Sequence, residues 1–492
     1  MRIRGVVACL CLALLASACN STTRLTAAHQ SAPRFDVAGG KPGIAEDEIT
    51  EDTSLDGADA STSVTGGSTA PGSPTSSTPG PKAASATLAM GTGVTAKSIL
   101  IGVETAKDIN AATAAVGAST DNPEEGAVAQ AVINYVNKHG GIAGRQVKAV
   151  FHEKDTTQGS WEVHAAATCA AFTEDNHVFA AIDSSVGGND ALASCLAQHG
   201  VPLVETDFWP FDAEAYKRLG HFLYQPSRMA PERAMAVYVD GLVSLGYFAN
   251  GAKVGLIGFD AAPFQRMTAA VKARLASHHL ALTDERTTIT PHGVTDFGEL
   301  GAQIQNAIIS FRSRGVDHVI FSEYAGQLPF LFLKAADAQG FHPRYGFNSM
   351  SRANTQASQG PASMSGAVNV GWLPTDDADV TQEYRGGAFA TCMDAAKQGG
   401  ISGSASGQRL YTSIFCDALL FLKAGLEQAT ALTPAGFEDA VGRLGRSFDS
   451  PGTYATNFFP GRHDGAAAVR YTKYNAGCEC MVYANDKLDP VG

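Results

Sequence analysis

Residues 131–151 read AVINYVNKHGGIAGRQVKAVF and combine a helical pattern, a double-glycine turn and a strand pattern. Apolar residues recur at helical spacing before Gly140 and Gly141. Two glycines end the predicted helix because they adopt backbone angles that other residues resist. Residues 146–151 (QVKAVF) then predict a buried strand. This helix–turn–strand succession predicts α/β architecture.

The same alternation continues on both sides of this stretch. Further strands are predicted at 98–103 (SILIGV), 178–182 (VFAAI), 201–205 (VPLVE), 253–258 (KVGLIG) and 318–322 (HVIFS), with helices between them. The alternation restarts after Pro231, and two successive series predict two parallel-sheet lobes. Residues after about 366 add one strand (368–372), three helices and a terminal strand pair, too little for a third lobe.

Five segments follow from this organisation. We expect a signal peptide at 1–18 and a linker at 19–96. We expect lobe one at 97–228 plus roughly 366–462, and lobe two at 229–365 plus roughly 463–492.

The N-terminus predicts export. Arg2 and Arg4 precede ten apolar residues, a run too short for a permanent membrane helix. The run ends in LASAC, which resembles a bacterial lipobox with Ala16 where Leu is usual, and predicts lipidation of Cys19. An ordinary secretory signal with an unrelated cysteine is the alternative. Either interpretation places the mature protein outside the cytoplasm, and the first anchors it on the outer face of the membrane.

Residues 20–96 lack the apolar side chains that a core requires. Phe35 is the sole aromatic residue there, and residues 61–86 carry a single charge, Lys82. This composition predicts a flexible tether. A cleaved linker without a function is the alternative.

Charge excludes some partners. The chain of 492 residues has a net charge of −12, and loss of residues 1–18 removes two arginines and no acid, leaving −14. An acidic protein is a poor partner for nucleic acid or for an anionic membrane surface. We therefore expect no nucleic-acid partner, and membrane contact only through the lipid anchor.

Six of the nine cysteines lie outside the signal and the anchor. An even number in an exported chain predicts disulfides. Cys169 and Cys195 flank one predicted strand and can pair locally. Cys478 and Cys480, two apart on a predicted strand, should point to opposite faces and so reach Cys392 and Cys416 rather than each other. The Cys-x-Cys spacing without a histidine cluster does not favour zinc, so we expect neither a metal nor a cofactor.

Several stretches resemble one family in order and spacing: 131–147, 195–204 (CLAQHGVPLV), 251–260 (GAKVGLIGFD), 316–343 and 410–444. They are similar to the type I periplasmic binding proteins, in the branch of the leucine/isoleucine/valine receptors of ABC importers. The resemblance implies two Rossmann-like lobes joined by a multi-strand hinge, with a small amino-acid-like ligand in the interlobe cleft. It also implies an ABC permease as partner and a monomeric protein.

Ligands of open parallel sheets bind beyond the carboxyl ends of the strands. The residues that follow predicted strands are therefore the candidate ligand residues: Glu104, Ser184, Ser185, Gly187, Thr206, Asp207, Trp209, Asp260, Glu323, Tyr324 and Asn348. The resemblance implies that the loops at 183–188 and 206–209 bind the ligand carboxylate. Each candidate also has a structural alternative: a helix cap for Ser184 and Ser185, a turn for Asp260, lobe packing for Trp209 and a solvated charge for Glu323.

Other functions find less support in the sequence. The metalloprotease, nucleophile-elbow and P-loop patterns H-E-x-x-H, G-x-S-x-G and G-x-x-x-x-G-K-[ST] do not occur. We therefore expect a binding protein and not an enzyme. A ligand sensor of the same fold that signals through a partner protein is the main alternative. An exported enzyme, with a catalytic triad assembled from distant residues, and an exported structural protein are the others.

Overall fold

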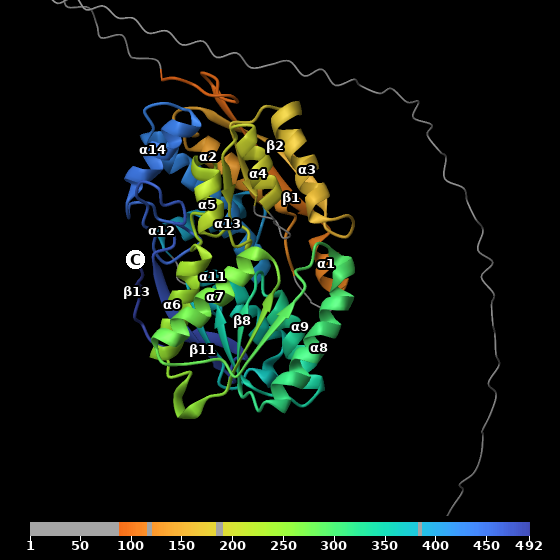
Figure 1. Ribbon diagram of the computed structural model, residues 1–492. Helices are drawn as coiled ribbons and strands as arrows, with labels where there is room; N and C mark the ends of the chain where they lie inside the picture. The colour runs from red at the N-terminus through yellow and green to blue at the C-terminus, as the bar shows by residue number, and fades with distance from the viewer. Residues whose placement is uncertain (1–87, 116–120, 184–189, 382–385) are drawn as a thin grey trace, which may run out of the picture. The chain divides into compact units, whose positions relative to one another are not determined.

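Two β-sheets, each with helices on both faces, form two lobes (Figure 1). The computed structural model describes residues 88–115, 121–183, 190–381 and 386–492. The predicted α/β fold with parallel-rich sheets is confirmed.

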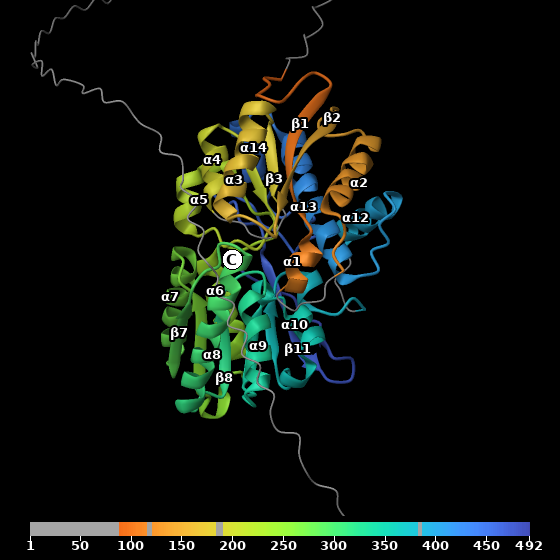
Figure 2. The ribbon, with the colours of Figure 1, turned by 90° about the vertical axis from the view of Figure 1, so that its right-hand side faces the viewer.

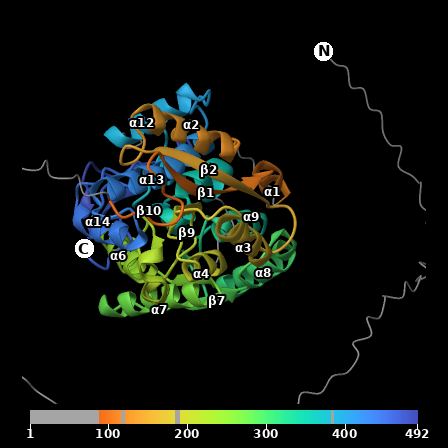
Figure 3. The same cartoon turned by 90° about the horizontal axis from the view of Figure 1, so that it is seen from above.

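Lobe one contains a parallel sheet in the order β2-β1-β3-β4-β5. Its strands are β1 (Ser98–Lys107), β2 (Gln146–Asp155), β3 (Ala180–Asp183), β4 (Leu203–Glu205) and β5 (Leu223–Tyr224). Its helices are α1 (Ile109–Ala115), α2 (Glu125–Lys138), α3 (Trp161–Ala170), α4 (Asp190–Gln198), α5 (Ala213–Leu219), α12 (Gly387–Gln398), α13 (Ser406–Gln428) and α14 (Pro434–Leu444). Helices α3 and α4 lie on one side of the sheet, and α2, α12 and α13 on the other (Figure 2). Viewed from above, α12 lies beside α2 (Figure 3).

Lobe two contains a mixed sheet in the order β12-β11-β10-β9-β8-β6-β7, with β13 paired to β11. Its strands are β6 (Val254–Phe259), β7 (Asp284–Thr288), β8 (His318–Ser322), β9 (Arg344–Asn348), β10 (Val368–Gly371), β11 (Ala468–Asn475), β12 (Cys480–Tyr483) and β13 (Asp489–Pro490). Its helices are α6 (Pro231–Ser244), α7 (Ala262–Ser277), α8 (Phe297–Ser313), α9 (Gln327–Ala338), α10 (Ala353–Gln359) and α11 (Pro374–Asp377). Helices α6 and α7 pack together on one face, and α8 packs with α9 on the other (Figure 1).

The chain passes between the lobes after β5, after β10 and before β11. One expectation about these crossings is wrong, because residues 368–372 were assigned to lobe one. Strand β10 instead pairs in parallel with β9 and antiparallel with β11, so both of its neighbours belong to the second sheet. The chain therefore crosses after Gly371, and α12, α13 and α14 return to lobe one.

The double-glycine turn has the predicted backbone. Gly140 and Gly141 have φ angles of 98° and 72°, in the left-handed region. A Cβ on Gly141 would lie 1.9 Å from the carbonyl oxygen of Arg145, so no other residue fits there. The turn directs the chain from α2 into β2, which pairs with β1 over its whole length.

Three disulfides are present among the described residues. Cys169–Cys195 joins α3 to α4 as expected, and Cys392–Cys416 joins α12 to α13. The third, Cys478–Cys480, contradicts the prediction that these two cysteines reach other partners. Cys478 lies in the turn before β12 and Cys480 is the first residue of that strand. Glu479 between them has a φ of 52°, so the strand alternation that would separate their side chains does not apply.

The described chain begins before the predicted end of the linker at residue 96. Met90 forms a bridge with Leu432 at the start of α14, and the Gly91 amide donates to the Leu432 carbonyl at 2.8 Å. Residues 88–96 are therefore part of lobe one. Within the described ranges, no helix combines the length and apolar character that crossing a bilayer requires.

Candidate functional site

The loop after β4 brings lobe one to the boundary between the lobes. Arg228 fixes this loop, because its Nε donates to the Asp207 carbonyl at 3.0 Å and its Nη2 to the Thr206 carbonyl at 2.5 Å. The Asp207 amide donates to the Glu205 carboxylate at 2.9 Å. Thr206 and Asp207, both predicted ligand residues, are buried here, and Phe208 lies under the Arg228 guanidinium at 4.5 Å.

An aromatic cluster connects the two lobes. The ring of Trp209 from lobe one lies 5.6 Å from Phe264 of α7 and 5.3 Å from Tyr324, which follows β8. Phe264 and Tyr324 stack at 5.4 Å. Edge-to-face and stacked pairs at these separations are stabilising. The structure thus brings together the predicted residues Trp209 and Tyr324, but they contact each other, and the Trp209 indole N–H donates to Asp190 at 3.1 Å.

Glu104 lies in a buried ion pair. Its carboxylate accepts from Lys154 Nζ at 3.1 Å and from the Thr168 hydroxyl at 2.5 Å. Burial alone would raise the pKa of Glu104, but Lys154 and the hydrogen bonds from neighbouring side chains hold it below its ordinary value. Burial alone would lower the pKa of Lys154, but the charges of Glu104 and Asp183 hold it above its ordinary range.

Acidic groups gather at the carboxyl ends of the lobe-one strands. Burial raises the pKa of Glu205 well above its ordinary value, and the charges of Asp183 and Asp207 add to this. The three acids end β3 and β4 or follow them directly. This part of the interlobe boundary therefore disfavours a further negative charge.

Glu323 of lobe two precedes Tyr324 of the aromatic cluster. It follows β8, and its Oε2 accepts from the Gln327 amide at 3.1 Å. Its Oε1 is buried without a hydrogen-bond partner, as is the Tyr324 hydroxyl. Burial raises the pKa of Glu323 to about 8, so the buried carboxyl is mainly protonated at pH 7. The expectation of a solvated loop charge does not describe this residue.

Two other predicted residues have local structural contacts. Asn348 is buried at the end of β9, and its Oδ1 accepts from the Met350 amide at 2.9 Å, which caps the turn at 349–351. Asp260 is exposed, and its carboxylate accepts from the Thr290 amide and hydroxyl at 2.8 and 2.9 Å. This contact ties two loops of lobe two together, in agreement with the turn alternative. Ser184, Ser185 and Gly187 lie outside the described residues.

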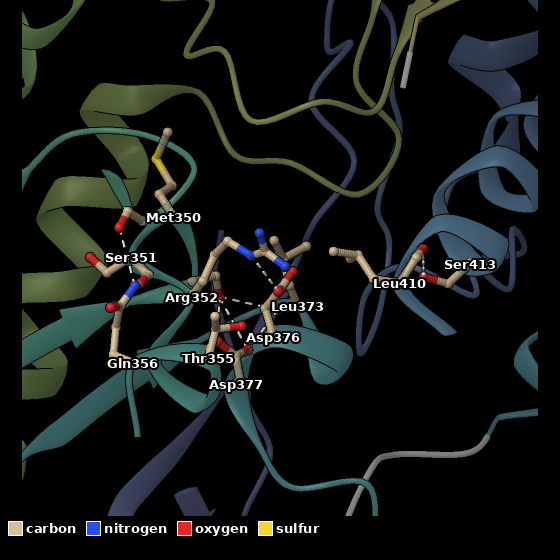
Figure 4. Close-up of polar contacts among 12 residues, drawn as sticks. Met350, Ser351, Arg352, Thr355, Gln356, Leu373, Asp376, Asp377, Leu410 and Ser413 are labelled. Carbon is tan, nitrogen blue, oxygen red and sulfur yellow. Dashed lines mark hydrogen bonds and ion pairs between the residues drawn. The ribbon is translucent and has the colours of Figure 1, made fainter. Parts of the chain in front are cut away.

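A cavity of about 180 Å³ lies between the lobes. Its lining comes from α10, α11 and the residues beside these helices in lobe two, and from the start of α13 in lobe one. The lining residues are Arg352, Asn354, Thr355, Ser358, Thr375, Asp376, Asp379, Val380, Ser406, Arg409 and Leu410. Figure 4 shows Arg352 and Asp376 on one side and Leu410 of α13 facing them, with Ser413 beyond Leu410.

Arg352 dominates the lobe-two wall of the cavity. Its Nε donates to Asp376 Oδ1 at 3.0 Å, and its guanidinium carbon lies 5.6 Å from the Phe208 ring. Arg352 therefore links the cavity to the predicted loop after β4. Its φ of 52° places a non-glycine residue in the left-handed region, a strained conformation that recurs at functional sites.

Arg352 and Asp376 were not among the predicted ligand residues. Arg352 lies four residues beyond β9, where only Asn348 at the strand end was selected. Asp376 follows β10, which was recognised, so the rule that selected the other candidates would have found it if extended five residues beyond the strand.

Two parallel-sheet lobes with a polar cavity between them define a two-lobed ligand-binding protein. The chain belongs to the periplasmic binding protein family, whose model matches residues 109–479. The type I branch expected from the sequence is confirmed. No curated protein sequence matches the chain.

Solved structures show the same fold. A substrate-binding protein from Desulfitobacterium hafniense in complex with Leu has a TM-score of 0.54 and 15% identity, covering 79% of this chain and 100% of its own. A fatty acid ABC transporter substrate-binding protein from Thermomonospora curvata has a TM-score of 0.58 and 18% identity, covering 82% and 98%. An R. palustris solute-binding protein in complex with 4-hydroxybenzoate has a TM-score of 0.60 and 13% identity, covering 80% and 98%. At these identities the likeness establishes the fold alone.

Proposed function

We propose that the protein is an exported solute-binding lipoprotein that delivers a small polar ligand to an ABC importer. The cavity carries this proposal, because its walls come from both lobes: Arg352 and Asp376 from lobe two, and Ser406 and Leu410 from lobe one. A ligand that contacts both walls favours the arrangement in which the lobes meet. Hinge closure of this kind presents a permease with a ligand-dependent surface.

The proposed ligand is an amino acid or a related compound. Structural neighbours include proteins described in complex with Leu and with valine, although others are described with a fatty acid or 4-hydroxybenzoate. The cavity volume of about 180 Å³ is large enough for a small organic molecule.

Anchoring completes the proposal. Lipidation of Cys19 would keep the protein at the outer face of the membrane, and the linker would give the lobes their distance from it. The proposed partners are the small ligand and the permease, with the protein acting as a monomer without a cofactor.

Thermal unfolding of the chain lacking residues 1–19 tests the proposal. The library contains amino acids, amides, small peptides and short organic acids. We expect one chemical class to raise the melting temperature, because a ligand that binds only the native state stabilises it by mass action. No shift, combined with no copurified small molecule in native mass spectrometry, would contradict the proposal.

Uptake in cells distinguishes import from sensing. Deletion of the gene should abolish uptake of the radiolabelled ligand found in the screen. Unchanged uptake with an altered transcriptional response to that ligand would favour the sensor.

A further inference from the structure

We infer that Arg352 is the anion receptor of the interlobe cavity, and that the ligand carries a carboxylate next to a hydrogen-bond donor. This inference rests on the proposed function, because it assigns ligand chemistry to the same cavity. It follows from two polar groups on one wall that the protein itself leaves unsatisfied.

The first group is the outer edge of the Arg352 guanidinium. Only Nε is used, in the bond to Asp376 Oδ1. Among the described residues, neither Nη atom has a hydrogen-bond partner, and the side chain is 20% exposed, into the cavity. Two Nη groups in one plane match the two oxygens of a carboxylate.

The second group is Asp376 Oδ2. Asp376 is 2% exposed, and this oxygen is buried without a hydrogen-bond partner. An unsatisfied buried acceptor costs about 1–3 kcal/mol, which a donor on the ligand would recover. Oδ1 of Asp376 already accepts from Arg352 Nε, so Asp376 lies beside the guanidinium. A ligand donor bound to Asp376 Oδ2 would therefore lie next to a ligand carboxylate bound to the Arg352 Nη groups. The two ligand groups must therefore be neighbours, as in an α-amino or α-hydroxy acid.

Lobe one supplies the opposite wall. Helix α13 begins there, with Ser406 and Leu410 lining the cavity. Its N-cap residue, Ala405, provides no side-chain cap, so the positive end of a 23-residue helix adds to the attraction for an anion.

The other charged groups of the cavity already have protein partners. Arg409 Nη1 donates to the carbonyls of Gly403 and Ser404 at 3.2 and 2.7 Å. The Asp379 carboxylate accepts from the Thr381 amide and hydroxyl at 2.9 and 2.7 Å. Arg352 is thus the cation whose remaining donors face the cavity. This places carboxylate recognition in lobe two, whereas the sequence resemblance placed it in the lobe-one loops.

The test compares acids with their amides in titration calorimetry on the chain lacking residues 1–19. The probes are leucine with leucinamide, lactate with lactamide and benzoate with benzamide. We expect acids to bind about 10- to 100-fold more tightly than amides, the range of a charge-assisted hydrogen bond. Lactate should exceed propanoate, which lacks the donor for Asp376.

Variants of Arg352 test whether its two Nη groups cause the preference for acids. R352Q should remove the preference for acids, and R352K should remove most of it while retaining the charge beside Asp376. R409Q is the matched control, since it removes the same charge from the same cavity at a residue whose Nη1 already donates to the Gly403 and Ser404 carbonyls, and it should retain the preference. Circular dichroism and thermal unfolding verify that each variant folds.

The outcomes separate the two claims. Ligand binding without a preference for acids, or an acid preference that survives in folded R352Q and R352K, overturns the assignment of Arg352 and leaves the solute-binding function intact. If no member of the full library binds the wild-type protein, the proposed function fails and the inference fails with it.

Discussion

Glu323 is a buried residue whose ionisation makes the stability of the protein depend on pH. Its pKa of about 8 exceeds the value of about 4.3 for an unfolded glutamate, so the native state binds this proton more tightly. The contribution of Glu323 to the free energy of unfolding is therefore complete below about pH 4 and is lost as the pH rises toward 8. Each pH unit in that window costs about 1.4 kcal/mol from this group.

We expect E323Q to reduce the loss of stability between about pH 5 and 8. Glutamine retains an acceptor for the Gln327 amide and has no carboxyl to ionise. Urea unfolding at several pH values measures the effect, and E299Q, at an exposed position on α8, is the control. Asp377, whose pKa burial raises to about 8, still titrates in the variant, so the profile should become shallower without becoming flat. A profile identical to that of the wild type would contradict the assignment.

The buried Lys154–Glu104 ion pair leads to a second prediction, about the free energy of unfolding. K154M leaves the Glu104 carboxylate buried without its cation, and loss of one partner from a buried pair costs about 3–5 kcal/mol. Urea unfolding should show this loss, and K154M/E104Q should regain part of it because the buried charge is also removed. A loss below about 1 kcal/mol in K154M would show that the pair is not a structural element of lobe one.

At the scale of elements, the disulfides differ in what they constrain. Cys169–Cys195 joins two helices across 26 residues, whereas Cys478–Cys480 closes a turn across two. The chain-entropy model assigns about 3–4 kcal/mol to the first and less than half of that to the second. Cys478 is also exposed, so a reductant reaches it directly.

Limited reduction should therefore open Cys478–Cys480 first. Alkylation followed by peptide mass spectrometry identifies the reduced pair, and C478A/C480A should unfold in urea close to the wild-type midpoint. C169A/C195A should lose about 3 kcal/mol or more. Earlier alkylation of Cys169 than of Cys478 would contradict this order.

Elements with a strong local signal could be predicted from the sequence. Helix α2, its glycine turn and strands β1, β2, β6 and β8 combine apolar runs with clear end signals. Strands β7 (DERTT) and β9 (RYGFN) were missed because polar and charged residues interrupt their apolar pattern, and sheet pairing defines them instead.

The site was partly predictable for the same reason. The strand-end rule found Trp209 and Tyr324, which meet at the lobe boundary, and the buried Glu323. It also selected Glu104, whose burial beside Lys154 depends on a strand 50 residues away. It selected Asn348 at the end of β9 but missed Arg352, which lies four residues beyond that strand.

At the scale of the whole molecule, contacts between the lobes decide how readily the cleft closes. On one side, Arg266 of α7 pairs with Asp212, the N-cap of α5, with Nε 2.5 Å from Oδ2. Elsewhere the Trp161 amide of α3 donates to the His292 carbonyl of lobe two at 3.1 Å. The aromatic cluster around Trp209 lies between the lobes.

The Arg266–Asp212 pair should tune ligand affinity without contacting the ligand. Asp212 is 2% exposed and Arg266 is 42% exposed, so loss of the arginine leaves a carboxylate unpaired where the lobes meet. R266Q should shift the population away from the closed form, and affinity falls in proportion to the closed fraction. A half-exposed pair contributes about 1 kcal/mol, so we expect roughly a fivefold increase in Kd.

R274Q is a matched control for this effect. Arg274 lies on the same helix and is also 42% exposed, but it pairs with Asp240 within lobe two. It should leave the Kd unchanged while costing similar stability, because it does not touch the lobe boundary. Small-angle scattering of R266Q should show a larger radius of gyration than R274Q without ligand. Equal affinities and equal radii for the two variants would mean that this pair does not couple closure to binding.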